Sequence, residues 1–333
     1  MVPVLSKLYQ ILPESIKNHP RMIELVQRFN NNNKFREIDS HYKMLDMIFA
    51  SCDIKATGVM RQIQLLSLEL LKLFDNICNK YDLEYWLDYG TLLGAVRHGG
   101  FVPWDDDIDI GMIREDYDKF VEIFPQEIEK LDSIKDNIII SKLTRPHDNL
   151  EETNELDALN NNTFILFFQC AYKKPFVHFD VFPKDEGLTP ERNNLETELQ
   201  VELRNKIESG DWTFEEGLEV QRNKMKFCDE RTNQISDAVD GLHNNIHNRI
   251  YKTEYVFPLK KIRFEHYEFS CPNNYKKYLP LIYGPEYMHI PRIALDHNTT
   301  GFVKNQFNNN EEEINQGFEE AIQKLKDINE NFR

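Results

Sequence analysis

Apolar residues recur every three or four positions in two long stretches of the chain, and this spacing predicts helices. The first stretch covers residues 60–81, with apolar positions Ile63, Leu66, Leu70, Leu73, Phe74, Ile77 and Tyr81. The second covers residues 311–332, with Ile314, Phe318, Ile322, Leu325 and Ile328. Both stretches carry charged residues between the apolar ones, so we expect each helix to pack one stripe against a core.

A third, shorter helix is expected over residues 114–124. Glu115 and Asp116 would lie in its first turn, where the helix dipole favours negative charge. The segment from about 190 to 250 is predicted to be a helical insertion. Its apolar residues repeat at intervals of four over residues 191–207, and Thr213 with Glu216 has the spacing of a capping box.

Strands are predicted where β-branched and aromatic residues are concentrated. These segments are residues 84–89, 136–143, 165–171, 175–182 and 256–269. Lys173 and Lys174 lie between the third and fourth segments, which we therefore expect to pair through a turn at these lysines. The polar, asparagine-rich residues 146–163 predict a loop.

Four aspartates fall within five positions, and they are the strongest chemical signal in the sequence. If residues 105–110 form a strand, Asp105, Asp107 and Asp109 lie on one face, and Asp106 lies on the other with two isoleucines. Mutual repulsion among three such carboxylates raises their pKa values, and a divalent cation removes the conflict. Oxygen ligands suit Mg²⁺, Mn²⁺ or Ca²⁺. Apolar flanks on both sides favour a metal site over a solvated acidic turn.

A calcium-binding loop of the helix–loop–helix type is excluded by two of its required positions. That loop needs glycine at its sixth position and a bidentate glutamate at its twelfth. Counted from Asp105, these positions hold Ile110 and Asp116. A β-branched residue cannot make the required turn.

Small and basic residues near the aspartates are candidates for binding phosphate. Gly90 and Thr91 form a small-residue turn whose backbone N–H groups and hydroxyl could approach phosphate oxygens. Arg97 offers a planar guanidinium that matches phosphate geometry. Lys260, with Lys261, is a further candidate, although an ordinary exposed turn explains that pair equally well.

At this point the chain resembles the LicD family of phosphotransferases, which includes the fukutin-related proteins. The resemblance rests on GTLLGAVRHGGFVPWDDDIDIGM at residues 90–112, HFDVFP at residues 178–183, and the run over residues 256–291. It implies an α/β (α+β) fold similar to that of the nucleotidyltransferases, with a mixed sheet flanked by helices. The pattern of that fold is a Gly-Thr turn, then Asp-x-Asp, then a third carboxylate on a neighbouring strand. Carried over, these are Gly90-Thr91, Asp107 with Asp109, and Asp180.

The same resemblance implies an activity and its cofactor. The expected reaction moves phosphocholine, or a polyol phosphate such as ribitol or glycerol phosphate, from a CDP-activated donor to a hydroxyl of a cell-surface glycan. CMP is released. Mg²⁺, or Mn²⁺ in its place, would bridge Asp107 and Asp109 to the donor, with Asp105 beside them. Asp180 would share the metal or take the proton of the acceptor hydroxyl. The alternatives are a metal-dependent glycosyltransferase and a non-catalytic protein on the same scaffold.

The resemblance and the element pattern together divide the chain into three parts. We predict an N-terminal helical extension over residues 1–59, a catalytic domain over residues 60–291 that includes the helical insertion, and a C-terminal loop and helix over residues 292–333.

Net charge and cysteine content indicate which partners and which cell compartment to expect. The formal net charge is −16, which disfavours nucleic acid because such partners require a basic surface. The five cysteines are scattered and lack zinc spacing, which is typical of reduced thiols in the cytoplasm. There is no signal-peptide pattern and no apolar run of about 18 residues, so we expect no transmembrane segment and a cytoplasmic location. Peripheral membrane contact through the first helix stays open.

Overall fold

The structure, a computed structural model, describes most of the chain between residues 54 and 332. The described ranges are residues 54–141, 168–186, 209–213, 233–237, 250–290 and 298–332, with residues 43, 44, 46, 47, 202, 205, 206, 216, 217 and 220 besides. The chain divides into one unit of Met1–Ile54 with Met288–Ala294 and another of Lys55–Tyr287 with Leu295–Arg333. All elements named below belong to the second unit. The predicted domain boundaries stay predictions.

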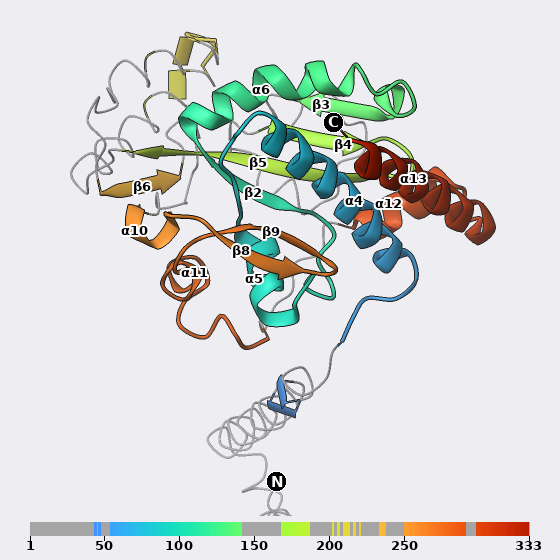
Figure 1. Ribbon diagram of the computed structural model, residues 1–333, viewed down its shortest axis with the longest axis horizontal. Coiled ribbons are helices and arrows are strands. Elements are labelled where there is room, and N and C mark those ends of the chain that lie inside the picture. The colour runs from blue at the N-terminus through green and yellow to red at the C-terminus, as the bar shows by residue number, and fades with distance from the viewer. Residues whose placement is uncertain are drawn as a thin grey trace, which may run out of the picture. The chain divides into compact units, whose positions relative to one another are not determined.

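A mixed sheet forms the centre of this unit (Figure 1). Its main path runs through β1 (Trp86–Leu87), β2 (Asp109–Ile113), β5 (Val177–Glu186), β4 (Phe168–Tyr172) and β3 (Ile138–Ser141). Two further strands, β6 (Gln234–Asp237) and β7 (Ile250–Lys252), continue from the far end of β5. Strands β2 and β5 are parallel, whereas the other described pairs are antiparallel. The expected mixed α/β fold is confirmed.

Two helices cover one face of the sheet through interlocking aromatic rings. Helix α4 (Gly58–Lys80) contributes Phe74, and helix α6 (Arg114–Ile128) contributes Phe120 and Phe124. The ring of Phe179 on β5 meets Phe74 at 5.4 Å and Phe124 at 5.8 Å, so both helices pack on the Phe179 face. Helix α13 (Glu311–Asn331) lies beside α4 (Figure 1). The helices predicted over residues 60–81, 114–124 and 311–332 are therefore confirmed.

The remaining described elements are short helices, a 3-10 turn and a separate two-stranded sheet. They are α5 (Tyr89–His98), a 3-10 turn (Lys135–Asn137), α10 (Thr253–Val256), β8 (Lys260–Phe264), β9 (Tyr267–Cys271), α11 (Tyr275–Tyr283) and α12 (Thr299–Gln306). The strand expected over residues 256–269 is a hairpin of β8 and β9 that turns at Glu265. Among the described cysteines, Cys78, Cys170 and Cys271 are buried free thiols.

The segment predicted as a helical insertion is described only in part. Its capping box is confirmed, because the Thr213 N–H donates to the Glu216 carboxylate at 2.8 Å and the Glu216 N–H donates to the Thr213 hydroxyl at 3.2 Å. The same segment also supplies strand β6, so the prediction of helix alone was wrong there. The loop predicted over residues 146–163 lies outside the described residues.

Two local predictions around the aspartates differ from the structure. Strand β2 begins at Asp109, so residues 105–108 form an irregular segment rather than a strand. The strand expected over residues 84–89 is limited to β1, and Gly90-Thr91 lies in the first turn of α5 rather than in a loop. The helix forms because the Asp88 side chain accepts from the Tyr89 N–H, and its carbonyl accepts from the Leu92 N–H at 2.9 Å.

Candidate functional site

Asp109 and Asp180 are direct neighbours across the parallel strands β2 and β5. The Asp180 N–H donates to the carbonyl of Ile108 at 2.8 Å, which fixes this register. Side chains alternate between faces along a strand, and Phe179 points to the helices. Asp180 therefore points to the opposite face, and Asp109 lies beside it. This is the neighbouring-strand position that the family resemblance implies for the third carboxylate.

The irregular segment before β2 brings three more carboxylates together. One oxygen from each of Asp105, Asp106 and Asp107 lies within 4.8 Å of the others. Asp106 is 2 % exposed and accepts from the Thr299 N–H at 3.3 Å, so it also holds the start of α12. Asp107 is 9 % exposed. Because the segment is not a strand, Asp106 joins its neighbours instead of facing away from them.

The electrostatic conflict among these groups is concentrated on Asp109. Burial raises the pKa of Asp109, and the carboxylates of Asp107, Asp180 and Asp105 raise it further, to well above its ordinary 3.8. We call Asp105, Asp107, Asp109 and Asp180 the aspartate cluster. A divalent cation would remove its repulsion, and a donor set made only of carboxylate oxygens fits Mg²⁺ or Mn²⁺.

Two polar residues that sequence reasoning missed contact the aspartate cluster. The Gln169 amide on β4 donates to Oδ1 of Asp180 at 3.0 Å, across a direct strand pair. Nε2 of His178 lies 3.9 Å from Oδ2 of Asp107. His178 precedes Asp180 by two positions, so strand alternation alone could have placed it on the same face. Gln169 could be found only from the register of the hairpin.

Gly90 and Thr91 pack directly against the aspartate cluster. A Cβ atom at position 90 would lie 2.7 Å from Oδ2 of Asp105, so the carboxylate occupies the space that a side chain would need. The Thr91 hydroxyl accepts from the Asp109 N–H at 2.8 Å. Both residues thus shape the cluster. Their predicted contact with phosphate stays a prediction.

Arg97 on α5 and Lys260 on β8 make contacts with residues outside the aspartate cluster. Arg97 donates to Nε2 of His98 at 2.9 Å and to the carbonyl of Tyr287 at 3.1 Å, and its guanidinium lies 5.9 Å from the ring of Trp104. Trp104 directly precedes Asp105, so Arg97 contacts the segment that carries the cluster. Lys260 is exposed and donates to the carbonyl of Asn273 at 2.9 Å. Their phosphate roles stay predictions.

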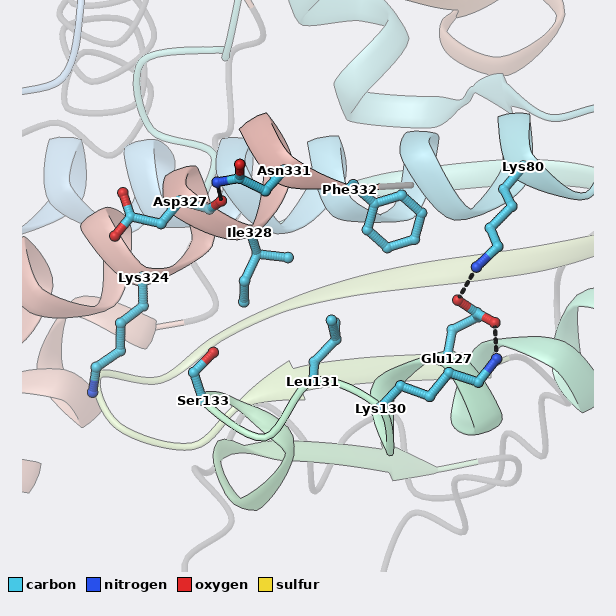
Figure 2. Close-up of a pocket in the computed structure, with 10 residues that line it drawn as sticks. All are labelled: Lys80, Glu127, Lys130, Leu131, Ser133, Lys324, Asp327, Ile328, Asn331 and Phe332. Carbon is cyan, nitrogen blue, oxygen red and sulfur yellow. Dashed lines mark hydrogen bonds and ion pairs between the residues drawn. The ribbon is translucent and has the colours of Figure 1, made fainter.

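A separate cavity of about 510 Å³ lies among the C-terminal ends of α4, α6 and α13 (Figure 2). Its lining includes Lys80 and Lys130, and Figure 2 shows both ammonium groups directed at the carboxylate of Glu127. The two lysines hold the pKa of Glu127 at about 2 although burial raises it. No member of the aspartate cluster lines this cavity, and its central charges are paired within the chain. It is therefore not the candidate site.

Comparison with known proteins matches the region that holds the site. The family model described as "LicD/FKTN/FKRP, nucleotidyltransferase domain" matches residues 82–187. The lipopolysaccharide cholinephosphotransferase LicD of Haemophilus influenzae is 36% identical over 111 residues, which are 33% of this chain and 36% of that protein. The human ribitol 5-phosphate transferase FKRP is 56% identical over 34 residues, 10% of this chain and 7% of that protein. The human ribitol-5-phosphate transferase FKTN is 39% identical over 49 residues, 15% and 11% of the two chains.

The family match covers the candidate site, and the relatives match this chain over only part of their lengths. The chain spans about a third of the length of the Haemophilus relative that it matches. The family match contains the whole aspartate cluster together with Gly90, Thr91 and Arg97. Within the described residues, no helix is both long and apolar enough to cross a membrane.

Proposed function

We propose that this chain, whose residues 82–187 match the LicD nucleotidyltransferase-domain model, is a metal-dependent phosphotransferase. It transfers a phospho-alcohol group from a CDP-activated donor to a hydroxyl of a cell-surface glycan and releases CMP. The observation that carries the proposal is the register that sets Asp109 beside Asp180, with Asp107 and Asp105 next to them. Relatives named as cholinephosphotransferase and ribitol 5-phosphate transferase support phosphocholine or a polyol phosphate as the transferred group.

The aspartate cluster would hold the metal. Asp107 and Asp109 would hold one or two Mg²⁺ ions, or Mn²⁺, with Asp105 and Asp180 as further ligands. When bound, the cation neutralises charge on the donor pyrophosphate and on the departing CMP. The carboxylates suit a cation because burial and the neighbouring aspartates raise the pKa of Asp109, and no positive group is among the causes of that shift.

The chain's own residues then orient the two substrates. The acceptor oxygen attacks the phosphorus that carries choline or the polyol. The bond between that phosphorus and the CMP oxygen breaks on the opposite side, and the acceptor hydroxyl loses its proton. Asp180 takes that proton, or shares the metal. Gln169 holds Oδ1 of Asp180, which fixes the orientation of the carboxylate in either role. Gly90, Thr91, Arg97 and Lys260 would contact the donor phosphates.

The location and partners follow from the same proposal. The donor would be taken from the cytoplasm, the acceptor glycan would be the second partner, and nucleic acid would not bind. The predicted peripheral contact with a membrane concerns the N-terminal residues, which lie outside the described residues.

The donor can be tested by thermal stabilisation followed by product analysis. A ligand that binds only the folded state raises Tm by mass action. With Mg²⁺ present, we expect CDP-choline, CDP-ribitol or CDP-glycerol to raise Tm and UDP-sugars not to, and turnover should release CMP. Asp107→Asn should lose the shift, whereas the control Asp132→Asn, on an exposed turn, should keep it. A shift with UDP-sugars alone, with release of a nucleoside diphosphate, would favour the glycosyltransferase.

A further inference from the structure

Lys184 is a fully buried lysine that the proposed reaction does not use. It lies on β5 four positions after Asp180 and is 0 % exposed. Its ammonium group lies 2.8 Å from Oδ2 of Asp88 and 2.7 Å from Oδ1 of Asp237, and it donates to the Tyr89 hydroxyl at 3.1 Å. The contacts with Asp237 and Tyr89 are hydrogen bonds, and the contact with Asp88 is an ion pair. Burial lowers the pKa of Lys184, but Asp237 and Asp88 outweigh it and raise the pKa well above its ordinary value, so the ammonium stays charged.

Asp88 connects this lysine to the first strand of the candidate site. Its side chain is completely buried, and Oδ1 accepts from the Tyr89 N–H at 2.9 Å and from the Tyr278 hydroxyl at 2.8 Å. Its own N–H donates to the carbonyl of Asp109 at 3.0 Å. Asp88 is therefore held by Lys184 on one side and bonded to strand β2 on the other.

The three residues after Asp88 carry the connection into the aspartate cluster. Tyr89 has a φ of 35°, a left-handed conformation that a non-glycine residue keeps only when its surroundings hold it there. Gly90 then packs against the Asp105 carboxylate, and the Thr91 hydroxyl accepts from the Asp109 N–H. A shift of this backbone would displace two members of the cluster.

Lys184 cannot act on a substrate directly, because protein atoms enclose its ammonium completely. Removing its charge would leave the buried Asp88 and the half-buried Asp237 without their cation, which is a destabilising change. Asp88 already raises the pKa of Asp109. The loss of Lys184 would therefore disturb both the backbone that carries the cluster and the field around it.

We propose that Lys184 is a positioning residue: through Asp88 it fixes the backbone of residues 88–91, and thereby sets the affinity of the aspartate cluster for a divalent cation. The inference rests on the proposed function only in that the cluster binds a cation. It does not depend on which group the enzyme transfers.

The test compares Lys184→Met with Asp185→Asn, using Mn²⁺ as the probe. Asp185 is the next residue on β5, is also buried, and accepts from Arg114 at 2.8 and 3.0 Å, so its loss also breaks a buried ion pair. Mn²⁺ affinity is measured by calorimetry on the full chain, and Tm by scanning calorimetry. We expect both variants to lose Tm. Only Lys184→Met should bind Mn²⁺ more weakly, by about tenfold, with Asp185→Asn within twofold of the unmodified chain.

Two outcomes would overturn the inference alone. One is unchanged Mn²⁺ affinity in Lys184→Met, and the other is an equal loss in Asp185→Asn. If Lys184→Met does not fold, Asp88→Asn replaces it, because the amide keeps the shape of the side chain but removes the charge that holds Lys184; the same tenfold loss is expected. An unmodified chain that binds no divalent cation would overturn the proposed function as well, so the two failures are distinguishable.

Discussion

The aspartate cluster and Glu265 differ in whether positive side chains of the chain neutralise their negative charge. Glu265 is 7 % exposed, and its carboxylate accepts from Arg61 at 2.9 Å and from Lys55 at 3.1 Å. Burial raises its pKa, but the hydrogen bonds from Arg61 and Lys55 outweigh burial and hold the pKa at about 2. Around Asp109, burial and the neighbouring carboxylates all raise the pKa. The chain supplies its own cations to Glu265 but not to Asp109, and this contrast supports the proposal that the aspartate cluster binds an external cation.

The largest effect is expected when the cluster loses one charge. Asp109→Asn should reduce turnover by about a thousandfold, because metal stabilisation of the transition state is worth several kcal/mol and about 4 kcal/mol corresponds to that factor. The fold should remain, and Tm without metal should hold or rise, because repulsion is relieved. Steady-state kinetics and scanning calorimetry measure the two effects. Retained activity in both Asp107→Asn and Asp109→Asn would exclude the metal assignment.

The opposite result is expected at Glu265. Glu265→Gln should lower the free energy of unfolding by about 2 kcal/mol, because the buried side chain loses its charge-assisted hydrogen bonds from the half-buried Arg61 and the exposed Lys55. Activity of the folded enzyme should change little. Denaturant unfolding gives the stability, and Glu268→Gln on the exposed face of β9 is the matched control, with no expected change. Equal stability of the two variants would show that the contacts of Glu265 with Arg61 and Lys55 do not stabilise the fold.

Asp180→Asn separates three roles of the same carboxylate. A metal ligand should lose Mg²⁺ and donor affinity together, whereas a base should keep donor binding and slow the transfer step by roughly a hundredfold or more. A purely structural residue would lower Tm and leave the activity of the folded fraction near normal. We expect a mixture of the first two, because Asp180 is paired with Asp109 in the sheet. Donor affinity, single-turnover rate and Tm resolve the cases, and near-normal turnover would remove Asp180 from the site.

The smallest effect is a pH dependence of the metal-free protein. The folded pKa of Asp109 is raised above 3.8, so the folded state binds a proton that the unfolded state releases. Stability contributed by this group is present below pH 3.8 and is lost as pH rises through the raised value, by at most about 1.4 kcal/mol per pH unit.

The contribution of Glu265 to stability depends on pH in the opposite direction. It is present above pH 4.5 and is lost as pH falls toward 2. Above pH 5 only the Asp109 effect should therefore appear. With a chelator present, the unmodified chain should lose stability relative to Asp109→Asn between pH 5 and pH 8. A constant difference between the two proteins would contradict the raised pKa.

The sequence predicted the parts of the fold in which one-sided burial imposes a period. Helices α4, α6 and α13 were located within a few residues of their bounds. These predictions need only neighbouring positions in the chain. The strand prediction failed for residues 105–108, where the Asp106 carboxylate accepts a hydrogen bond from Thr299, which is distant in sequence.

The contacts that complete the site depend on pairings between distant segments. Gln169 reaches Asp180 only because the hairpin register sets the two opposite each other. Lys184 would be placed on the surface by composition rules, since lysine is rarely fully buried without partners. Its partners Asp88 and Asp237 come from segments on either side of β5, and nothing in the local sequence shows that they converge there.

The parallel pairing of β2 with β5 also determines when the cluster can form. Parallel strands cannot be joined by a tight turn, and here α6 and the strands β3 and β4 lie between positions 109 and 180. During synthesis, the chain that ends before β5 already holds three of the four carboxylates but has no partner strand to set them. Non-local pairing of this kind forms late in folding. Under the proposed function, binding of a cation would therefore require the completed sheet, and truncated or misfolded chains would lack the metal site.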